Sequence, residues 1–168
     1  MGLKKTSSLV NIGAHVTESA ANTYTEQEVT LPLSSLDREV FVVTDAWIET
    51  FDPDGIAGTN SSVLAQIVKT TQGGQIHINN PTTIGRYEIT SWSLGIEGSL
   101  SAKDFPQPAG TTGSSRDFLA IIATPNFFLG VEGVANAVAK QAFCRVQGYR
   151  ATATADVFAA LVTEEINS

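Results

Sequence analysis

The sequence predicts an all-β protein: an antiparallel jelly-roll β-sandwich of about eight strands with a short C-terminal helix. Runs of β-branched and aromatic residues recur between residues 28 and 150, and turn-forming Gly, Pro, Asn and Asp separate them. No helical segment of crossover length lies between these runs, as a parallel sheet would require. An orthogonal barrel is the alternative, whereas the lack of a fixed repeat argues against propellers and solenoids.

Composition favours one soluble globular domain. The chain has 168 residues, a formal net charge of −7, 42% hydrophobic and 16% charged residues. A single cysteine, Cys144, excludes an internal disulfide framework and a zinc site built on several thiolates. No apolar run approaches the roughly 20 residues of a membrane span, and residues 1–8 lack a signal-peptide core, so we expect synthesis in a cytoplasm.

Residues 1–27 are predicted to form an N-terminal arm, and residues 28–168 the jelly-roll domain. The arm is rich in Ser, Thr, Asn and Ala and holds no sustained period of 2 or 3.6. Its apolar residues gain free energy only when docked, so we expect them to contact another subunit. These residues are Leu9, Val10, Ile12 and Val16. A short edge strand around residues 9–12 and a leader that docks nowhere are the alternatives.

Eight strand regions are predicted in the domain. They cover residues 28–33, 39–51, 63–70, 75–78, 84–100, 117–124, 127–133 and 139–150. Pro32 cannot donate to a ladder, which places the first strand at an edge or a bulge. Gly73 and Gly74 predict a tight hairpin between the third and fourth strands. In the last strand, Cys144 and Phe143 face opposite sides.

Two further segments depart from this pattern. Residues 101–115 hold prolines, glycines and hydroxyl residues with little to bury, which predicts a long functional loop. Phe105, Pro106 and Pro108 are its candidate inter-subunit or surface contacts. Residues 154–166 switch to a helical period, with Asp156 as a possible cap. Glu164 and Glu165 oppose the helix dipole, so we expect the last turn to fray.

No catalytic residue, cofactor site or metal site is predicted, and the chain is not expected to be an enzyme. His15 and His77 lie in different segments without ligand spacing, and no Gly-x-Ser-x-Gly elbow occurs. Cys144 is predicted to pack as a small apolar core residue. Asp52, Asp54 and Asn60 crowd one loop, where a turn is favoured, although a cation at a subunit boundary stays open.

The strand set with its arm, polar loop and Ser/Thr-rich surface resembles the single jelly-roll capsid proteins of tailless icosahedral viruses. The resemblance rests on residues 29–33 with 36–43, and on residues 126–133, 148–150 and 156–158. It implies two four-stranded sheets and many copies assembling into a closed shell, in a virion made in the host cytoplasm. Other virion proteins are implied partners as well, and a membrane would be met only beneath a capsid.

The scarcity of basic residues distinguishes this chain from the capsid proteins of RNA viruses in that family, whose arm is usually rich in Arg and Lys. Lys and Arg number ten here and cluster only at Lys4 and Lys5, too few to neutralise many phosphates. We therefore expect no direct sequence-specific nucleic-acid binding, and a DNA virus fits better. Arg145 and Arg150 are predicted to form ion pairs within or between subunits.

Two other classes of protein remain open. A carbohydrate- or ligand-binding jelly roll would present Trp47, Trp92 or Tyr149 on an exposed face, whereas the tryptophans of a capsid subunit should lie in the core. A phage decoration or tail protein would bind onto another lattice instead of forming its own.

Overall fold

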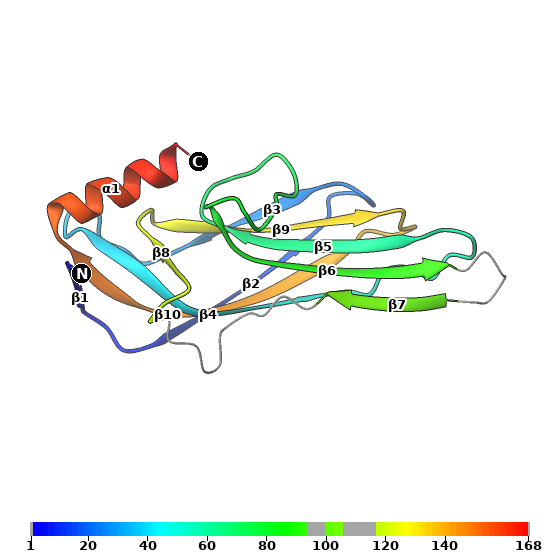
Figure 1. Cartoon of the computed structure of the whole chain (residues 1–168), viewed down its shortest axis with the longest axis horizontal. Helices are drawn as coiled ribbons and strands as arrows, with labels where there is room; N and C mark the ends of the chain where they lie inside the picture. Colours follow the sequence, from blue (N-terminus) through cyan, green and yellow to red (C-terminus); the bar gives the residue numbers. More distant parts are fainter. Residues whose placement is uncertain (1, 94–99, 106–116, 168) are drawn as a thin grey trace.

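The computed structural model describes residues 2–93, 100–105 and 117–167, which form ten strands and one helix (Figure 1). The elements are β1 (Leu3–Lys5), β2 (Val10–Thr17), β3 (Thr25–Thr30), β4 (Glu39–Thr50), β5 (Ser61–Val68), β6 (Thr83–Ser93), β7 (Leu100–Phe105), β8 (Ala120–Ile122), β9 (Asn126–Val134), β10 (Gln141–Ala153) and α1 (Ala155–Ile166).

The strands form two antiparallel five-stranded sheets. Sheet A has the order β1-β10-β4-β8, with β2 also paired to β10, and sheet B has the order β3-β9-β5-β6-β7. Four of the pairs are nested: β2 with β10, β3 with β9, β4 with β8 and β5 with β6. Such nesting arises when one long antiparallel ribbon folds over on itself, which is the jelly-roll topology. The predicted fold class is therefore confirmed.

The main core lies between the two sheets and is built by alternation along each strand. In β10, Ala142, Cys144 and Val146 point into this core, as predicted, while Phe143 and Arg145 point outward. In sheet B, Leu129 and the other inward residues of β9 are fully buried. The sheets thus close over one apolar layer contributed by nearly every strand.

A second apolar cluster lies on the outer face of sheet A, beneath α1. Val40, Val42 and Ala151 point outward there and are buried by the helix, which packs Phe158 and Leu161 against them. The helix lies over the end of the sandwich that carries β1 and β8 (Figure 1). Among the described residues, only this part of the outer face of sheet A is covered by another element.

A bulge in β4 marks the middle of sheet A. Gln147 pairs with Asp45 and Gly148 pairs with Val43, so Thr44 is the extra residue. A side chain at Gly148 would overlap the Val42 carbonyl oxygen and come within 2.6 Å of the Phe41 ring. The extra residue reverses the alternation of β4, so apolar residues face the core on both sides of the bulge.

The N-terminal segment requires a correction, because residues 3–5 and 10–17 form strands in sheet A. Both β1 and β2 pair with β10. The inward residues of β2 alternate along it, and Val16 is buried in the main core. The edge-strand alternative is therefore right, and the view of this segment as an arm without a core is wrong for the paired residues.

The predicted hairpin across Gly73 and Gly74 does not form. No strand covers residues 75–78, and β5 pairs instead with β6. The buried Gln66 side chain explains the difference: its amide oxygen accepts from Ile76 N at 2.8 Å and its amide nitrogen donates to Gly74 O at 3.1 Å. Glu26 accepts from Thr71 Oγ1 and Gln72 N of the same loop, so side chains of two strands hold it against sheet B.

The helix end and the polar segment also differ from expectation. Glu165 is buried, and its carboxylate accepts from Ala123 N and Thr124 N at 2.8 and 2.9 Å, so the last turn is anchored rather than frayed. Thr154, without a side-chain cap, occupies the N-cap position that Asp156 was expected to serve. The predicted loop over residues 101–115 begins instead as strand β7.

Candidate interaction surface

The outer face of sheet A has a second half, formed by β2, the first half of β10 and the second half of β4, which no described helix or strand covers. We call this region the open face. The strand register arranges its outward residues in three rows across the strands. The rows are His15–Phe143–Glu49, Gly13–Arg145–Trp47 and Asn11–Gln147–Asp45. Aromatic, charged and amide groups therefore share this face, whereas aliphatic residues fill the half beneath α1.

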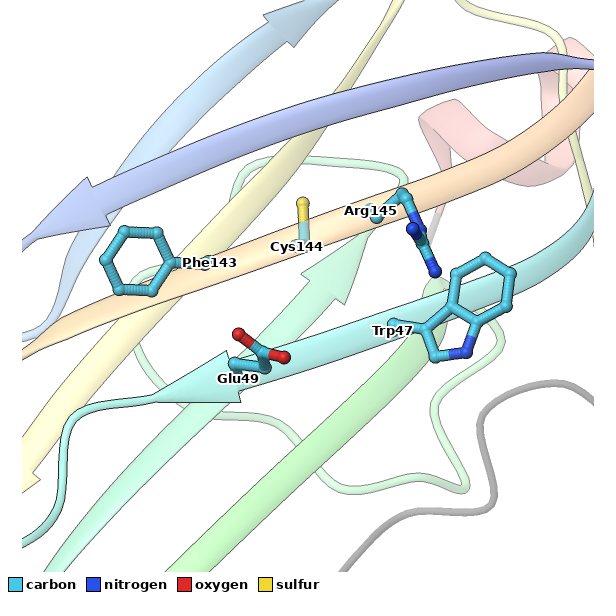
Figure 2. Close-up of a pocket in the computed structure, with 5 residues that line it drawn as sticks. All are labelled: Trp47, Glu49, Phe143, Cys144 and Arg145. Atoms are coloured by element: carbon cyan, nitrogen blue, oxygen red, sulfur yellow. The ribbon is translucent and has the colours of Figure 1, made fainter.

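Arg145 lies over Trp47 in the central row. Its guanidinium carbon is 4.4 Å from the centre of the indole ring, which is a cation–π contact (Figure 2). The sequence predicted an ion pair for Arg145, but the described contact is with a ring. Arg150 does pair with a carboxylate, that of Glu39, at 3.8 Å. One face of the indole is thus occupied by the chain's own cation.

A shallow hollow of about 280 Å³ lies beside this contact. It is lined by Trp47, Glu49, Phe143, Cys144 and Arg145 (Figure 2). Phe143 is 36% exposed and forms ring contacts with His15 at 6.3 Å and with Phe51 at 5.8 Å between centroids. The open face therefore combines a hollow of mixed polar and apolar lining with an exposed aromatic patch.

The thiol beside this hollow is poorly suited to nucleophilic chemistry. Cys144 belongs to the main core, and burial raises the pKa of its thiol to about 11, although a backbone hydrogen bond with Ala14 opposes the shift. A thiol with this pKa is protonated at neutral pH. The predicted core role of Cys144 is confirmed.

The two histidines lie far apart, as their separation in sequence suggested, one on sheet A and the other in a loop. His15 stands on the open face beside Phe143, and His77 belongs to the loop over sheet B, where its Nδ1 is 3.5 Å from an Arg86 nitrogen. Within the described ranges, no cluster of three His, Cys, Asp or Glu residues is placed to hold a metal ion.

The oxygen atoms of the acidic loop after β4 accept hydrogen bonds from other groups of the same chain. Asp54 Oδ1 accepts from Lys140 Nζ at 2.6 Å, and its Oδ2 accepts from Ala137 N at 2.7 Å. The hydrogen bond from Lys140 lowers the pKa of Asp54. Asp52 accepts from the same ammonium through its carbonyl, and Asn60 accepts from Ser93 N. These contacts support the turn interpretation over a cation site.

The predicted contact residues have different environments. Val16 is a core residue and Ile12 packs against the same core, so their apolar side chains serve the chain itself. Leu9 and Val10 are 53% and 39% exposed, and their contact with another copy stays a prediction. Pro106 and Pro108 lie outside the described residues, and the backbone of Phe105 ends β7.

The expectation that the tryptophans of a capsid subunit lie in the core does not hold for this chain. Trp47 is half-buried on the open face, and Trp92 is 43% exposed. Tyr149 is half-buried with Lys5 Nζ 4.5 Å from its ring centre. Ala46 and Ile48 flank Trp47 and point into the core. The period-2 alternation of β4 was therefore a signal from which the surface position of Trp47 could be predicted.

Comparisons with known proteins give distant similarities. No family model matches the sequence, and no curated protein matches it. Among solved structures, the unassembled pentamer of Merkel cell polyomavirus VP1 is 7% identical with a TM-score of 0.39, covering 88% of this chain and 97% of that chain. A structure of Desmodium yellow mottle tymovirus is 12% identical with a TM-score of 0.28, covering 88% and 87%.

Both structures are of viral proteins. Because both TM-scores lie below 0.5, the assignment of the jelly roll rests on the strand pairing described above. In the described parts of the chain, no helix has the length and apolar character needed to cross a bilayer.

Proposed function

We propose that this chain is a structural subunit that assembles with copies of itself into a closed icosahedral shell, the capsid of a virion. The observation that carries the proposal is the patch of exposed apolar side chains on a jelly roll whose own core is already closed. The patch comprises Phe51 and Phe143, which are both exposed and whose ring centroids are 5.8 Å apart. Exposed apolar groups that gather at one place mark contact surfaces for other proteins.

The patch is held in a fixed shape by hydrogen bonds between its segments. Phe51 N donates to Gln141 O at 3.0 Å, which joins the end of β4 to the start of β10. The ladder between β4 and β10 continues through Phe143, which pairs with Glu49. A preorganised apolar surface loses little conformational entropy on association, so burial at about 25 cal/mol per Å² offsets more of the cost of binding.

The segment expected to be an arm supports self-association only through its exposed residues. Ile12 and Val16 already pack in their own chain, whereas Leu9 and Val10 remain exposed at the beginning of β2. Symmetric copies present the same patch many times, so modest contacts can add up to a stable shell. Other virion proteins are further proposed partners.

Particle formation is the direct test. We expect the purified full-length protein to form large particles, seen by size-exclusion chromatography with light scattering and by negative-stain microscopy. The double substitution Phe51→Ser/Phe143→Ser should weaken assembly while circular dichroism shows a folded chain. Ile78→Ser is the matched control, because Ile78 is 59% exposed but lies on the loop over sheet B. A wild-type protein that stays monomeric at high concentration contradicts the proposal.

A ligand-binding module is the second candidate, favoured by the two tryptophans outside the core. Trp92 is exposed, and Trp47 lines the hollow of the open face. Aromatic rings at a surface can stack against sugar rings. Quenching of tryptophan emission by a saturable carbohydrate ligand, lost in Trp92→Ala or Trp47→Ala, would support this candidate. Binding to a lattice that another protein has formed, with no particles from this chain alone, would indicate a decoration protein.

A further inference from the structure

Strand β2 lies at an edge of sheet A, and β10 is its one partner among the described strands. Glu18 N donates to Lys140 O at 2.9 Å, in the register of this pair. Backbone groups of alternate residues point to opposite neighbours in an antiparallel ladder. Those of Val10, Ile12, Ala14 and Val16 therefore point toward β10, and those of Asn11, Gly13, His15 and Thr17 toward the edge.

The other edges of the two sheets are short or charged. β1 and β8 have three residues each, and β1 contains two lysines. β3 carries Glu26 and Glu28, and β7 carries Lys103 and Asp104 in its sequence. Short length and charged residues are the usual means by which proteins prevent strands from pairing with other molecules.

β2 has neither kind of protection. It is eight residues long, with the sequence VNIGAHVT, and contains no Lys, Arg, Asp, Glu or Pro. Its outward side chains at Asn11, Gly13, His15 and Thr17 are exposed. Among the described edge strands, it is the long one that is free of charged residues, and a strand with these properties is a template for pairing.

We propose that β2 pairs antiparallel with β2 of a second copy of this chain, about a two-fold axis at Gly13, so that the two A sheets become one continuous sheet. The inference rests on the proposed self-assembly and names a contact through which copies join. The paired register sets Gly13 opposite Gly13 and Asn11 opposite His15. Both pairs use residues whose backbone groups point toward the edge, so the register satisfies those groups on both strands.

The β2 strand of a second copy is a better partner for this edge than any other edge strand of the chain. A two-fold contact is self-complementary, and β2 offers the same neutral strand from both sides. No like charges are opposed, because the opposite pairs are Gly with Gly and Asn with His. A side chain added at Gly13 would contact Cys144 O at 3.8 Å and nothing nearer, so the backbone there is open to approach.

Charge substitution tests the contact. Asn11→Lys/His15→Lys places like charges directly opposite one another across the two-fold axis, so we expect self-association to weaken by roughly tenfold or more. Asn11→Lys/His15→Glu places opposite charges there instead and should restore association. Gln27→Lys, at an exposed position on the edge strand β3, is the matched control and should leave association unchanged. Circular dichroism and thermal unfolding check that each variant is folded.

Hydrogen exchange provides a readout that does not depend on substitution. In the assembled wild-type protein, the amides of Gly13 and His15 should become protected, whereas in the dissociated protein only those of Ile12, Ala14 and Val16 are protected. Equal exchange of the Gly13 and His15 amides in both states overturns the inference.

The outcomes separate this inference from the proposed function. Particles that form unchanged in Asn11→Lys/His15→Lys place the contact elsewhere and overturn the inference while the proposed function stands. Dimers that are sensitive to these substitutions, without particles, support the contact and contradict the shell. A wild-type protein that is monomeric at every concentration contradicts both.

Discussion

The two halves of the outer face of sheet A come from the same strands, β4 and β10, yet within the part of the chain that the structure describes only one of them is covered. On one side of the bulge the outward residues are small or aliphatic, such as Val42 and Ala151, and α1 buries them. On the other side they are large and polar or aromatic, such as Trp47 and Arg145, and they remain at the surface. The same alternation thus produces either an internal core or a surface available to partners, depending on the side chains at the outward positions.

The largest expected effect comes from removing the boundary between these halves. In Gly148→Ala the added methyl group would overlap the Val42 carbonyl oxygen at the bulge, so the strands must shift. We expect a loss of about 3 kcal/mol in the free energy of unfolding, measured by chemical denaturation. Gly73→Ala is the control, because no atom lies within 4 Å of the added group. Equal stability of the two variants would show that the bulge does not require glycine.

An intermediate effect is expected from loosening the covered half. Glu165→Ala removes the acceptor of two backbone amides, those of Ala123 and Thr124. Donors left without a partner in a buried site cost free energy, and we expect a loss of about 2 kcal/mol. Hydrogen exchange should show faster exchange at Ala123. Glu164→Gln, at an exposed position on the same turn, should change stability by less than about 1 kcal/mol. An unchanged melting temperature in Glu165→Ala would contradict the anchoring role.

The smallest effect on stability is expected in the open half. Arg145→Ala removes a cation–π contact at the surface, which contributes about 1 kcal/mol or less. The same substitution uncovers one face of Trp47, so iodide should quench its emission more strongly. The measurement uses a Trp92→Phe background, in which Trp47 is the sole tryptophan. Unchanged quenching would mean that Arg145 does not cover the ring in solution.

Strand alternation made the fold class and the faces of β10 predictable, because period-2 patterns report directly on burial. Contacts between distant residues were not predictable in this way. Glu165 looked unfavourable at a helix C-terminus, yet its partner Ala123 lies 42 residues away in sequence. The two-glycine hairpin failed because Gln66, eight residues before Gly74, binds the loop from within the sheet. Local turn preference was outweighed by hydrogen bonds from the sheet, among them those of the buried Gln66 and of Glu26.

The open face and the edge strand were harder to predict. Residues 10–17 do alternate, but small residues such as Gly13 and Ala14 give a weak contrast in hydropathy, so the sequence alone predicts no sustained period there. The position of Trp47 was available from its neighbours Ala46 and Ile48, whereas its contact with Arg145 depends on the β4–β10 register. Pairing between strands so far apart in sequence cannot be derived from either strand alone.

The nested strand pairing also affects the order in which the chain can fold. β2 pairs with β10 through contacts such as Thr17 with Gln141, so its partner leaves the ribosome after every other strand has been made. Contacts this distant in sequence form slowly, because a long loop must close before they contribute. Throughout that interval the uncharged β2 strand is without its partner, so newly made chains should depend on low local concentration or on chaperones to avoid premature association.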